Sequence, residues 1–270
     1  MMNLSTLPLT FLNAIVPTLV VAVSVHRWVL RKEFPVHQKG AILISGTSSG
    51  IGRATCEWLA GQAIPTNYFL CWRLPNVKQV ILVDITNQHH ADAVIEQIKV
   101  DQVPLIALVN NPGLDDISTF EFMGVYTIRK IMEVNVMATY MLTQAALPII
   151  QQNKGRIITV SSAPGLLPGG RLLAAYQGSK HALEAMFDAL RVEVAPHDVS
   201  MSLIEPGFFL QSNSAEPSTE LATTTGSMEA TCQNIQDAIF EKYPKPRYLT
   251  SRVGALPSWL AARVVNVLPA

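Results

Sequence analysis

Tyr176 and Lys180 stand four residues apart in the run Tyr176-Gln-Gly-Ser-Lys180. Four residues make about one helical turn, so a helix would place the phenol and the ammonium on one face. A lysine beside a tyrosine favours the phenolate and is expected to lower the tyrosine pKa. The spacing therefore predicts a tyrosine that exchanges a proton with a ligand. The alternative is an ordinary solvated helix face.

A glycine-rich run, Gly46-Thr-Ser-Ser-Gly50-Ile-Gly52, lies upstream of this pair. Such a loop, when it opens a helix, presents backbone N–H groups and a helix N-terminus to a pyrophosphate. By itself a glycine-rich run is often only a turn. Together with the tyrosine and lysine, it indicates a nucleotide cofactor beside a tyrosine that moves a proton to or from an alcohol or ketone.

The composition indicates which kinds of partner to expect. The chain has 270 residues, a formal net charge of zero, 15% charged residues and 49% hydrophobic residues. Neutral charge gives no reason to expect a nucleic-acid partner, and the apolar balance suggests membrane contact. The cysteines Cys56, Cys71 and Cys232 show neither metal-ligand spacing nor a disulfide framework, so we expect no metal site and reduced, buried thiols.

The N-terminal region predicts a membrane anchor. Leu7 to Val25 contains no charged residue and is just long enough to cross a bilayer as a helix. Trp28 and the basic residues around it follow at once, which is typical of a cytoplasmic flank. The alternatives are a cleaved targeting segment and a hairpin that does not cross. We therefore expect a single-pass protein of the endoplasmic reticulum whose main domain faces the cytosol.

The body of the chain alternates apolar runs with segments of helical period. The expected strands are Ala41–Ser45, Asn67–Trp72, Val80–Val83, Leu105–Val109, Arg156–Val160 and Ser200–Ile204. The expected helices are Gly50–Leu59, Ala91–Lys99, Ile128–Gln151 and Ala174–Val194. This order predicts an α/β fold, a doubly wound, Rossmann-like parallel sheet, as one domain over residues 40–270 after an anchor and linker over residues 1–39.

Polar or glycine-containing runs follow four of the expected strands. They are the glycine loop, Asn110-Asn111, Ser161-Ser162 and Pro206-Gly207. Because the carboxyl ends of parallel strands share one edge of the sheet, we expect these runs to converge on one ligand crevice.

On these motifs the chain resembles the short-chain dehydrogenase/reductase family, from about Ala41 to Gly207. The matching residues, in order, are Gly46, Gly50, Gly52, Asn110-Asn111-Pro112-Gly113, Asn135, Ser162, Tyr176, Lys180 and Pro206-Gly207. The sequences at Ser179–Ala185, Ile204–Phe209 and Lys245–Tyr248 are similar to those of the retinol and 17β-hydroxysteroid dehydrogenase branch.

The resemblance implies an NAD(P)-dependent oxidoreductase that passes a hydride between a nicotinamide and a lipophilic alcohol or carbonyl. Tyr176 would be the general acid or base, and Lys180 would lower its pKa and hold the nicotinamide ribose. Ser162 would fix the substrate oxygen, with Ser161 as the poorer candidate. Asn135 would hold a water linked to Lys180; without the resemblance, a satisfied buried amide is the simpler interpretation.

The resemblance also implies a set of cofactor contacts. These are Gly46, Ser48, Ser49, Gly50, Ile51, Gly52, Arg73, Asp84, Ile85, Asn110, Asn111, Gly113, Tyr176, Lys180, Pro206 and Gly207. The second strand ends without the acidic residue that would bind the ribose diol of NAD. Arg73 follows it and suits a 2′-phosphate, with Arg53 to assist, so NADP(H) is favoured over NAD(H). The alternative for Arg73 is an ordinary surface arginine.

Three departures from the family pattern stand out. The segment from Arg73 to Val80 is too short for the usual crossover helix, Pro112 replaces an alanine, and the spacing from Ser162 to Tyr176 is one residue longer. The first departure leaves open a remodelled adenosine side, a defective gene model, or a non-catalytic, membrane-anchored scaffold on the same fold.

The substrate side of the chain is apolar. Residues 207–235 are expected to form a lid, and Met186, Phe187, Phe208 and Phe209 form either an apolar pocket or part of the core. Residues 257–268 suit either the membrane interface or docking against the domain. A homodimer through the helices that hold Asn135 and Tyr176 is the default expectation.

Overall fold

The computed structural model describes residues 33–36, 40–62, 68–70, 84–166, 171–207, 227–250, 252–253 and 256–257. The chain divides into two units, Met1–Glu33 and Phe34–Ala270, and every described residue except Glu33 belongs to the second. The predicted transmembrane helix therefore lies outside the described residues. Among the helices that are described, none is long and apolar enough to cross a bilayer.

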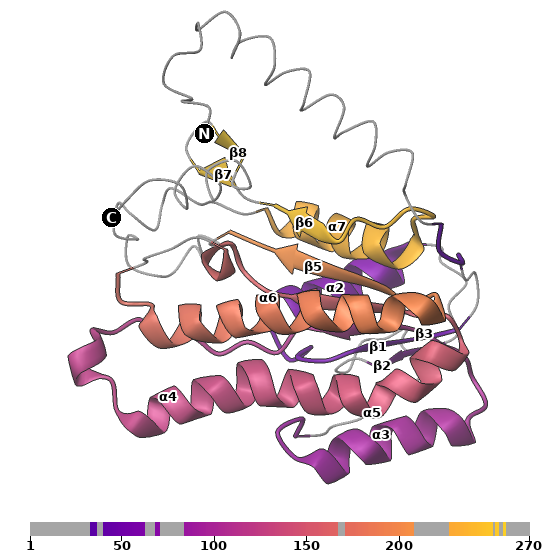
Figure 1. Cartoon of the computed structure of the whole chain (residues 1–270), viewed down its shortest axis with the longest axis horizontal. Helices are drawn as coiled ribbons and strands as arrows, with labels where there is room; N and C mark the ends of the chain where they lie inside the picture. Colours follow the sequence, from indigo (N-terminus) through magenta and orange to yellow (C-terminus); the bar gives the residue numbers. More distant parts are fainter. Residues whose placement is uncertain are drawn as a thin grey trace, which may run out of the picture. The chain divides into compact units, whose positions relative to one another are not determined.

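A parallel sheet of six strands, in the order β2-β1-β3-β4-β5-β6, runs through the described part of the second unit (Figure 1). Its strands are β1 (Ala41–Ile44), β2 (Tyr68–Leu70), β3 (Leu105–Asn110), β4 (Arg156–Val160), β5 (Ser200–Glu205) and β6 (Arg247–Leu249). Every pairing is parallel, so the carboxyl ends of the strands share one edge. A separate antiparallel pair joins β7 (Arg252–Val253) to β8 (Leu256–Pro257).

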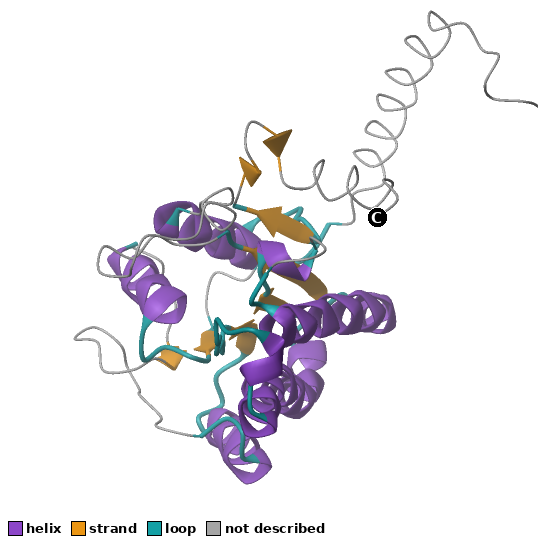
Figure 2. Ribbon diagram, turned by 90° about the vertical axis from the view of Figure 1, so that its left-hand side faces the viewer, coloured by secondary structure: helices purple, strands orange, loops and turns teal. Residues whose placement is uncertain are grey.

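Helices cover both faces of the sheet, as Figure 2 shows. Residues of α3 (Gln88–Val100), α5 (Ala138–Gln152) and α6 (Ala174–Val194) form one core cluster with the strands, and residues of α2 (Gly50–Gly61) and α7 (Met228–Phe240) form the other. Burial on both sides explains why β1, β3, β4 and β5 have no exposed position along their length. The predicted doubly wound α/β architecture is confirmed.

The helix boundaries follow from local chemistry. In α3, the Asn87 side chain accepts a hydrogen bond from the His89 N–H, and Ala91, Val94, Ile95 and Ile98 form the buried stripe. In α7, the Ser227 side chain caps the first turn by accepting from the Ala230 N–H. Such caps satisfy first-turn N–H groups that lack a partner inside the helix.

The long helix predicted over Ile128–Gln151 is interrupted. It consists of α4 (Val125–Met132), a π-helical turn, η3 (Glu133–Met137), and α5. Asn135 lies at the centre of this turn, and an insertion of this kind inside an α-helix is common at functional sites. Hydrophobic periodicity does not reveal a π turn, because the buried stripe continues on both sides of it.

The structure decides some of the other expectations, and the rest concern residues that it does not describe. The lid expected over residues 207–235 is wrong at its end, because residues 228–235 belong to α7, which packs against α2. Of the two alternatives for Met186 and Phe187, the structure confirms the core position. The expectation of reduced thiols is wrong for Cys56, which is disulfide-bonded, whereas Cys232 is free and buried. The predicted strand Val80–Val83, the short segment after Arg73, and residues 258–268 lie outside the described residues.

The inner face of α6 fixes the direction of its functional side chains, so its packing should be measurable. Phe187 is 1% exposed, and Phe187→Ala should lower the free energy of unfolding by about 3–5 kcal/mol through the cavity it leaves. Val192→Ala on the same helix removes a side chain that is 75% exposed, so its effect should stay within about 0.5 kcal/mol. Urea unfolding of both variants measures the difference; equal effects would contradict the inward orientation of Phe187.

Candidate active site

The glycine loop joins β1 to α2 with backbone angles that favour glycine. Gly46 has φ of +65° and Gly50 has φ of +56°, both in the left-handed region. A Cβ atom on Gly52 would lie 2.3 Å from the Gly46 carbonyl oxygen and 2.5 Å from the Asn111 Nδ2. Glycine at position 52 therefore lets the start of α2 press against its own loop and against the end of β3.

The start of α2 suits an anionic group. Ser49 is the N-cap residue, but its side chain makes no capping hydrogen bond, and no acidic residue occupies the first turn. A Cβ atom on Gly50 would meet no other atom within 4 Å. Ser48 and Ser49 are exposed beside this space, and Ile51 packs against the core below it. The geometry fits a pyrophosphate at a helix N-terminus.

The two asparagines after β3 have different surroundings. The Asn111 Nδ2 donates to the Gly46 carbonyl at 2.9 Å, so Asn111 fastens the glycine loop. Asn110 is fully buried, and its Nδ2 donates to the Thr143 Oγ1 at 2.9 Å and the Thr159 Oγ1 at 3.3 Å. The structure therefore places the Asn110 side chain in the interior, between β3, β4 and α5. A direct contact of Asn110 with a cofactor remains a prediction.

Tyr176, Lys180 and Ser162 come together beside the end of β4. The Lys180 Nζ donates to the Val160 carbonyl at 3.1 Å and lies 5.8 Å from the centroid of the Tyr176 ring. A hydrogen bond joins the side chains of Tyr176 and Ser162. A Cβ atom on Gly113 would lie 3.9 Å from the Lys180 Nζ, so the loop after β3 borders the same spot.

The choice between the two serines favours the one that was predicted. The Ser162 Oγ contacts Tyr176 and donates to the Pro206 carbonyl at 3.4 Å. The Ser161 Oγ is buried without a hydrogen-bond partner and lies near Gly165, where a Cβ atom would be 2.9 Å from it. The Pro206 carbonyl also accepts from the Ala163 N–H at 2.8 Å, so the buried Pro206-Gly207 element holds the serine loop in place.

The prediction that Lys180 lowers the Tyr176 pKa is wrong for this structure. Burial raises the pKa of Tyr176; the hydrogen bond with Ser162 opposes this rise and the charge of Asp115 adds to it. Burial also lowers the pKa of Lys180 to about 8, while the charges of Glu184 and Asp115 act in the opposite direction. At neutral pH Tyr176 is therefore a phenol, the form that can donate a proton.

Asn135 is a satisfied buried amide. Its Oδ1 accepts from the Leu114 N–H at 2.7 Å, and its Nδ2 donates to the Leu114 carbonyl and the Ser179 Oγ, both at 2.9 Å. The Asn135 carbonyl accepts from the Thr139 Oγ1 at 2.9 Å. Ser179 in turn donates to the Tyr176 carbonyl. Asn135 thus ties the loop after β3 to α6, and its role in holding a water remains a prediction.

The residues expected on the adenosine side are only partly described. Arg73 lies outside the described residues. Asp84 is exposed and accepts hydrogen bonds from the Thr86 N–H and Oγ1, which lower the pKa of its carboxyl. Ile85 follows it in the turn before α3. Arg53 pairs with Glu57 one helical turn away, at 2.9 Å. Contact of these residues with a nucleotide stays a prediction.

Sequence reasoning missed several polar residues near the site. Asp115 acts on both Tyr176 and Lys180 through its charge, and Glu184 acts on Lys180. Glu184 follows Lys180 by four residues, which is the same interval that links Tyr176 to Lys180 and was a usable signal. Asp115 carries no such pattern.

Comparison with known proteins identifies the class. The family model described as short chain dehydrogenase matches residues 40–221. Over 182 residues the chain is 33% identical to an NADPH-dependent 3-dehydrocapnine reductase of Ornithobacterium rhinotracheale, covering 61% of this chain and 64% of the relative. It is 29% identical to mouse retinol dehydrogenase 5, covering 80% and 70%. It is 32% identical to rabbit 11-beta-hydroxysteroid dehydrogenase type 2, covering 63% and 45%.

Solved structures share the fold. A short-chain dehydrogenase from Burkholderia cenocepacia in complex with NADP superposes with a TM-score of 0.66 at 21% identity, covering 85% of this chain and 94% of that one. One from Leptospira borgpetersenii with bound NAD+ gives 0.67 at 19% identity, covering 78% and 91%. With its glycine loop, Asn111, Ser162, Tyr176 and Lys180 at one sheet edge, the chain belongs to the short-chain dehydrogenase/reductase family and resembles its retinol and steroid dehydrogenases.

Proposed function

We propose that the chain is an oxidoreductase that interconverts a lipophilic alcohol and its ketone or aldehyde, with Tyr176 as general acid or base. The observation that carries this proposal is the meeting of Tyr176, Ser162 and Lys180 beside Gly113, next to the glycine loop. A neutral phenol hydrogen-bonded to a serine can pass a proton to a carbonyl oxygen, and the Ser162 hydroxyl can stabilise the charge that develops there.

A nicotinamide dinucleotide fits the residues that are present. The uncapped start of α2 and the open space at Gly50 suit its pyrophosphate, and Gly113 beside Lys180 suits its ribose. When bound, the nicotinamide supplies or accepts the hydride. We favour NADP(H) over NAD(H), because the second strand lacks a terminal acid and Arg73 follows it. The NADPH dependence of the Ornithobacterium reductase supports this choice.

The substrate class rests on the relatives and on the N-terminal sequence. Among the relatives, one acts on retinol, one on an 11-beta-hydroxysteroid, and a 30% identical one from Bacteroides thetaiotaomicron is a 3-ketodihydrosphingosine reductase. The chain spans 64% of the Ornithobacterium relative and 45% of the rabbit one, so their substrates serve only as proposals here. A retinoid, a steroid and a long-chain lipid each carry an alcohol or carbonyl group on an apolar body.

We also propose that Leu7–Val25 anchors the protein in the endoplasmic reticulum membrane with the catalytic domain in the cytosol. The support is the uncharged run and the basic flank after it. A lipophilic substrate held in a bilayer would then be close to the enzyme.

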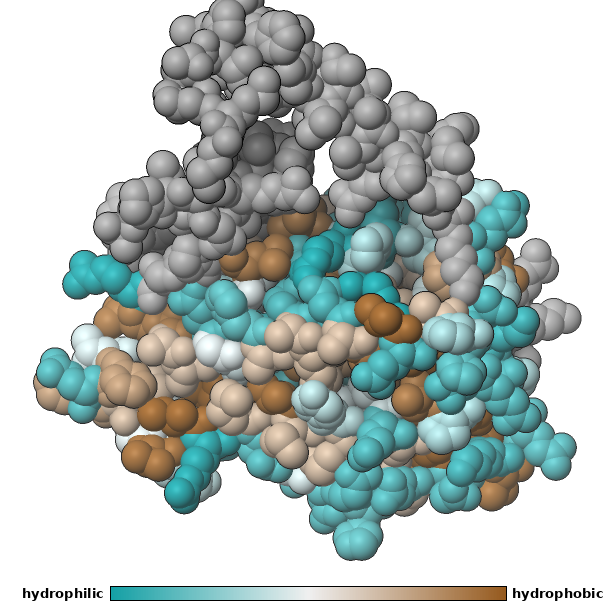
Figure 3. Space-filling view, viewed as in Figure 1, coloured by the Kyte–Doolittle hydropathy of each residue, from teal (hydrophilic) through white to brown (hydrophobic). Residues whose placement is uncertain are grey.

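A homodimer is the proposed assembly. Tyr126, Met137 and Tyr140 are exposed apolar or aromatic residues along α4, η3 and α5. Figure 3 shows a face of the molecule on which hydrophobic and hydrophilic side chains are interspersed over α4, α5 and α6. A mixed surface of this kind suits a modest interface between two copies.

Replacing the proposed acid tests the function directly. Tyr176→Phe removes the hydroxyl that passes the proton, so turnover of a lipophilic ketone should fall by roughly a hundredfold or more, while cofactor binding persists. Val192→Ala, at an exposed position of the same helix as Tyr176, should leave turnover unchanged. Steady-state kinetics measures both, and near wild-type turnover in Tyr176→Phe would exclude Tyr176 as the acid.

The dinucleotide loop has its own test. Gly52→Ala forces a methyl group against the Gly46 carbonyl and Asn111, and such overpacking costs about 1–3 kcal/mol. Cofactor affinity should fall by roughly tenfold or more. Gly61→Ala near the end of the same helix meets no atom within 4 Å and serves as the control. Fluorescence titration with the reduced cofactor compares the two, and equal affinities would mean that the loop is not the binding element.

A further inference from the structure

Tyr176, Lys180, Glu184 and Asp188 follow one another at four-residue intervals along α6. This interval places them in one row on a helix. Lys180 and Glu184 are both buried, with 3% and 5% of their surface exposed, whereas charged side chains are seldom buried so completely without a partner. The proposed reaction uses only the first two members of this row, so the role of Glu184 needs an explanation.

Glu184 and Lys180 border the same small space at the end of β4. A Cβ atom on Gly165 would lie 2.9 Å from the Ser161 Oγ, 3.2 Å from the Lys180 Cβ and 3.4 Å from the Glu184 Cγ. The Ser161 Oγ and the Glu184 Oε1 are buried and make no hydrogen bond. One oxygen of the Glu184 carboxylate is therefore buried with its acceptor capacity unused.

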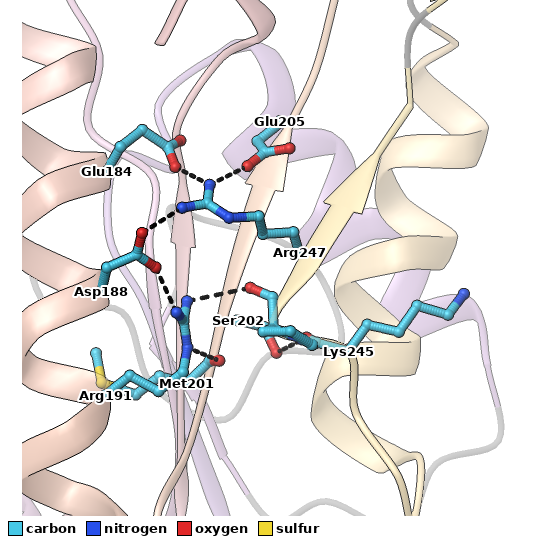
Figure 4. Close-up of polar contacts among 9 residues, drawn as sticks. Glu184, Asp188, Arg191, Met201, Ser202, Glu205, Lys245 and Arg247 are labelled. Carbon is cyan, nitrogen blue, oxygen red and sulfur yellow. Dashed lines mark hydrogen bonds and ion pairs between the residues drawn. The ribbon is translucent and has the colours of Figure 1, made fainter. Parts of the chain in front are cut away.

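Arg247 holds the other oxygen of Glu184, as Figure 4 shows. The Arg247 Nη1 bonds to the Glu184 Oε2 and, at 2.5 Å, to the Glu205 Oε1. The Arg247 Nη2 pairs with the Asp188 Oδ2 at 2.5 Å, and Arg191 holds the second oxygen of Asp188. A guanidinium that bonds to carboxylates on α6 and β5 fixes Glu184 in one orientation.

We propose that Glu184, fixed by Arg247, is a positioning residue for Lys180 that keeps its ammonium charged and oriented beside Tyr176. This inference rests on the proposed function, because it assigns a supporting carboxylate to the lysine of that site. The ammonium donates to the Val160 carbonyl, and the Glu184 carboxylate supplies the larger of the two opposite charges that act on this buried position.

The charges around Lys180 support this role. Burial lowers the pKa of Lys180 to about 8, and Glu184 and Asp115 are the groups that raise it. The Lys180 ammonium is therefore present below about pH 8 and is lost as the pH rises through that value. The other charged or titratable groups on α6 and the elements packed against it are Tyr176, His181, Asp188, Arg191 and Glu193 on α6, Tyr126, Arg129 and Lys130 on α4, Glu133 on η3, His197 on η5 (Ala195–His197), Glu205 on β5, and Arg247 and Tyr248 on β6.

The test is the titration of Lys180 itself in the full chain, followed by NMR of ¹³C-labelled lysine, with Lys180→Arg identifying its signal. In Glu184→Gln the titration midpoint should move to lower pH, because the supporting charge is gone. Glu184→Asp keeps the negative charge but moves it away by one methylene, so the Lys180 midpoint should lie between those of Glu184→Gln and the wild type. Glu193→Gln, at an exposed position of the same helix, should not move the midpoint.

An unchanged midpoint in folded Glu184→Gln would overturn the proposal. If this variant does not fold, the comparison of Glu184→Asp with the wild type decides in the same way. Turnover is measured separately: near pH 8.5, Glu184→Gln should lose roughly tenfold in kcat/KM, with recovery below pH 7. The two proposals can fail separately. If Glu184→Gln shifts the Lys180 midpoint but the wild type binds cofactor and reduces no carbonyl, the effect of Glu184 on Lys180 stands and the proposed function is rejected.

Discussion

The burial of the Lys180 ammonium is the physical constraint on which the rest of the site depends. An amine with 3% of its surface exposed loses most of its hydration, and its pKa falls to about 8 in consequence. The Val160 carbonyl and the charge of Glu184 offset part of this loss. Burial of Tyr176 itself raises the pKa of its phenol, so the tyrosine is protonated at neutral pH and can donate a proton.

The parallel sheet supplies the geometry for this pair. Because all the described strand pairings of the six-stranded sheet are parallel, the glycine loop, Asn111, Ser162 and Pro206 meet at one edge although they are far apart in the sequence. Asn111, after β3, donates a hydrogen bond to the carbonyl of Gly46, after the neighbouring strand β1. Asn135 bonds to Leu114 and to Ser179 on α6. These contacts hold the loop beyond β3 between the dinucleotide loop and the tyrosine helix.

The sequence predicts those features that depend on local spacing. The interval from Tyr176 to Lys180, the bounds of α6 and the apolar runs of β1, β3, β4 and β5 follow from periodicity, and the structure confirms them. The π turn at Asn135 and the interior position of Asn110 depend on packing between elements, which periodicity does not contain. The Arg247 contacts join β6, β5 and α6 across more than forty residues, so the sequence alone offers no spacing for them. The Tyr176 pKa was mispredicted because burial outweighs the effect expected from the lysine.

The central claim is that this sheet edge binds a nicotinamide dinucleotide next to Tyr176. Titration of the detergent-purified wild-type chain with NADPH and with NADH, followed by nicotinamide fluorescence, tests it most directly. We expect saturable binding, with NADPH bound more tightly than NADH. Failure of the folded chain to bind either cofactor would contradict the account, however complete the arrangement of Ser162, Tyr176 and Lys180.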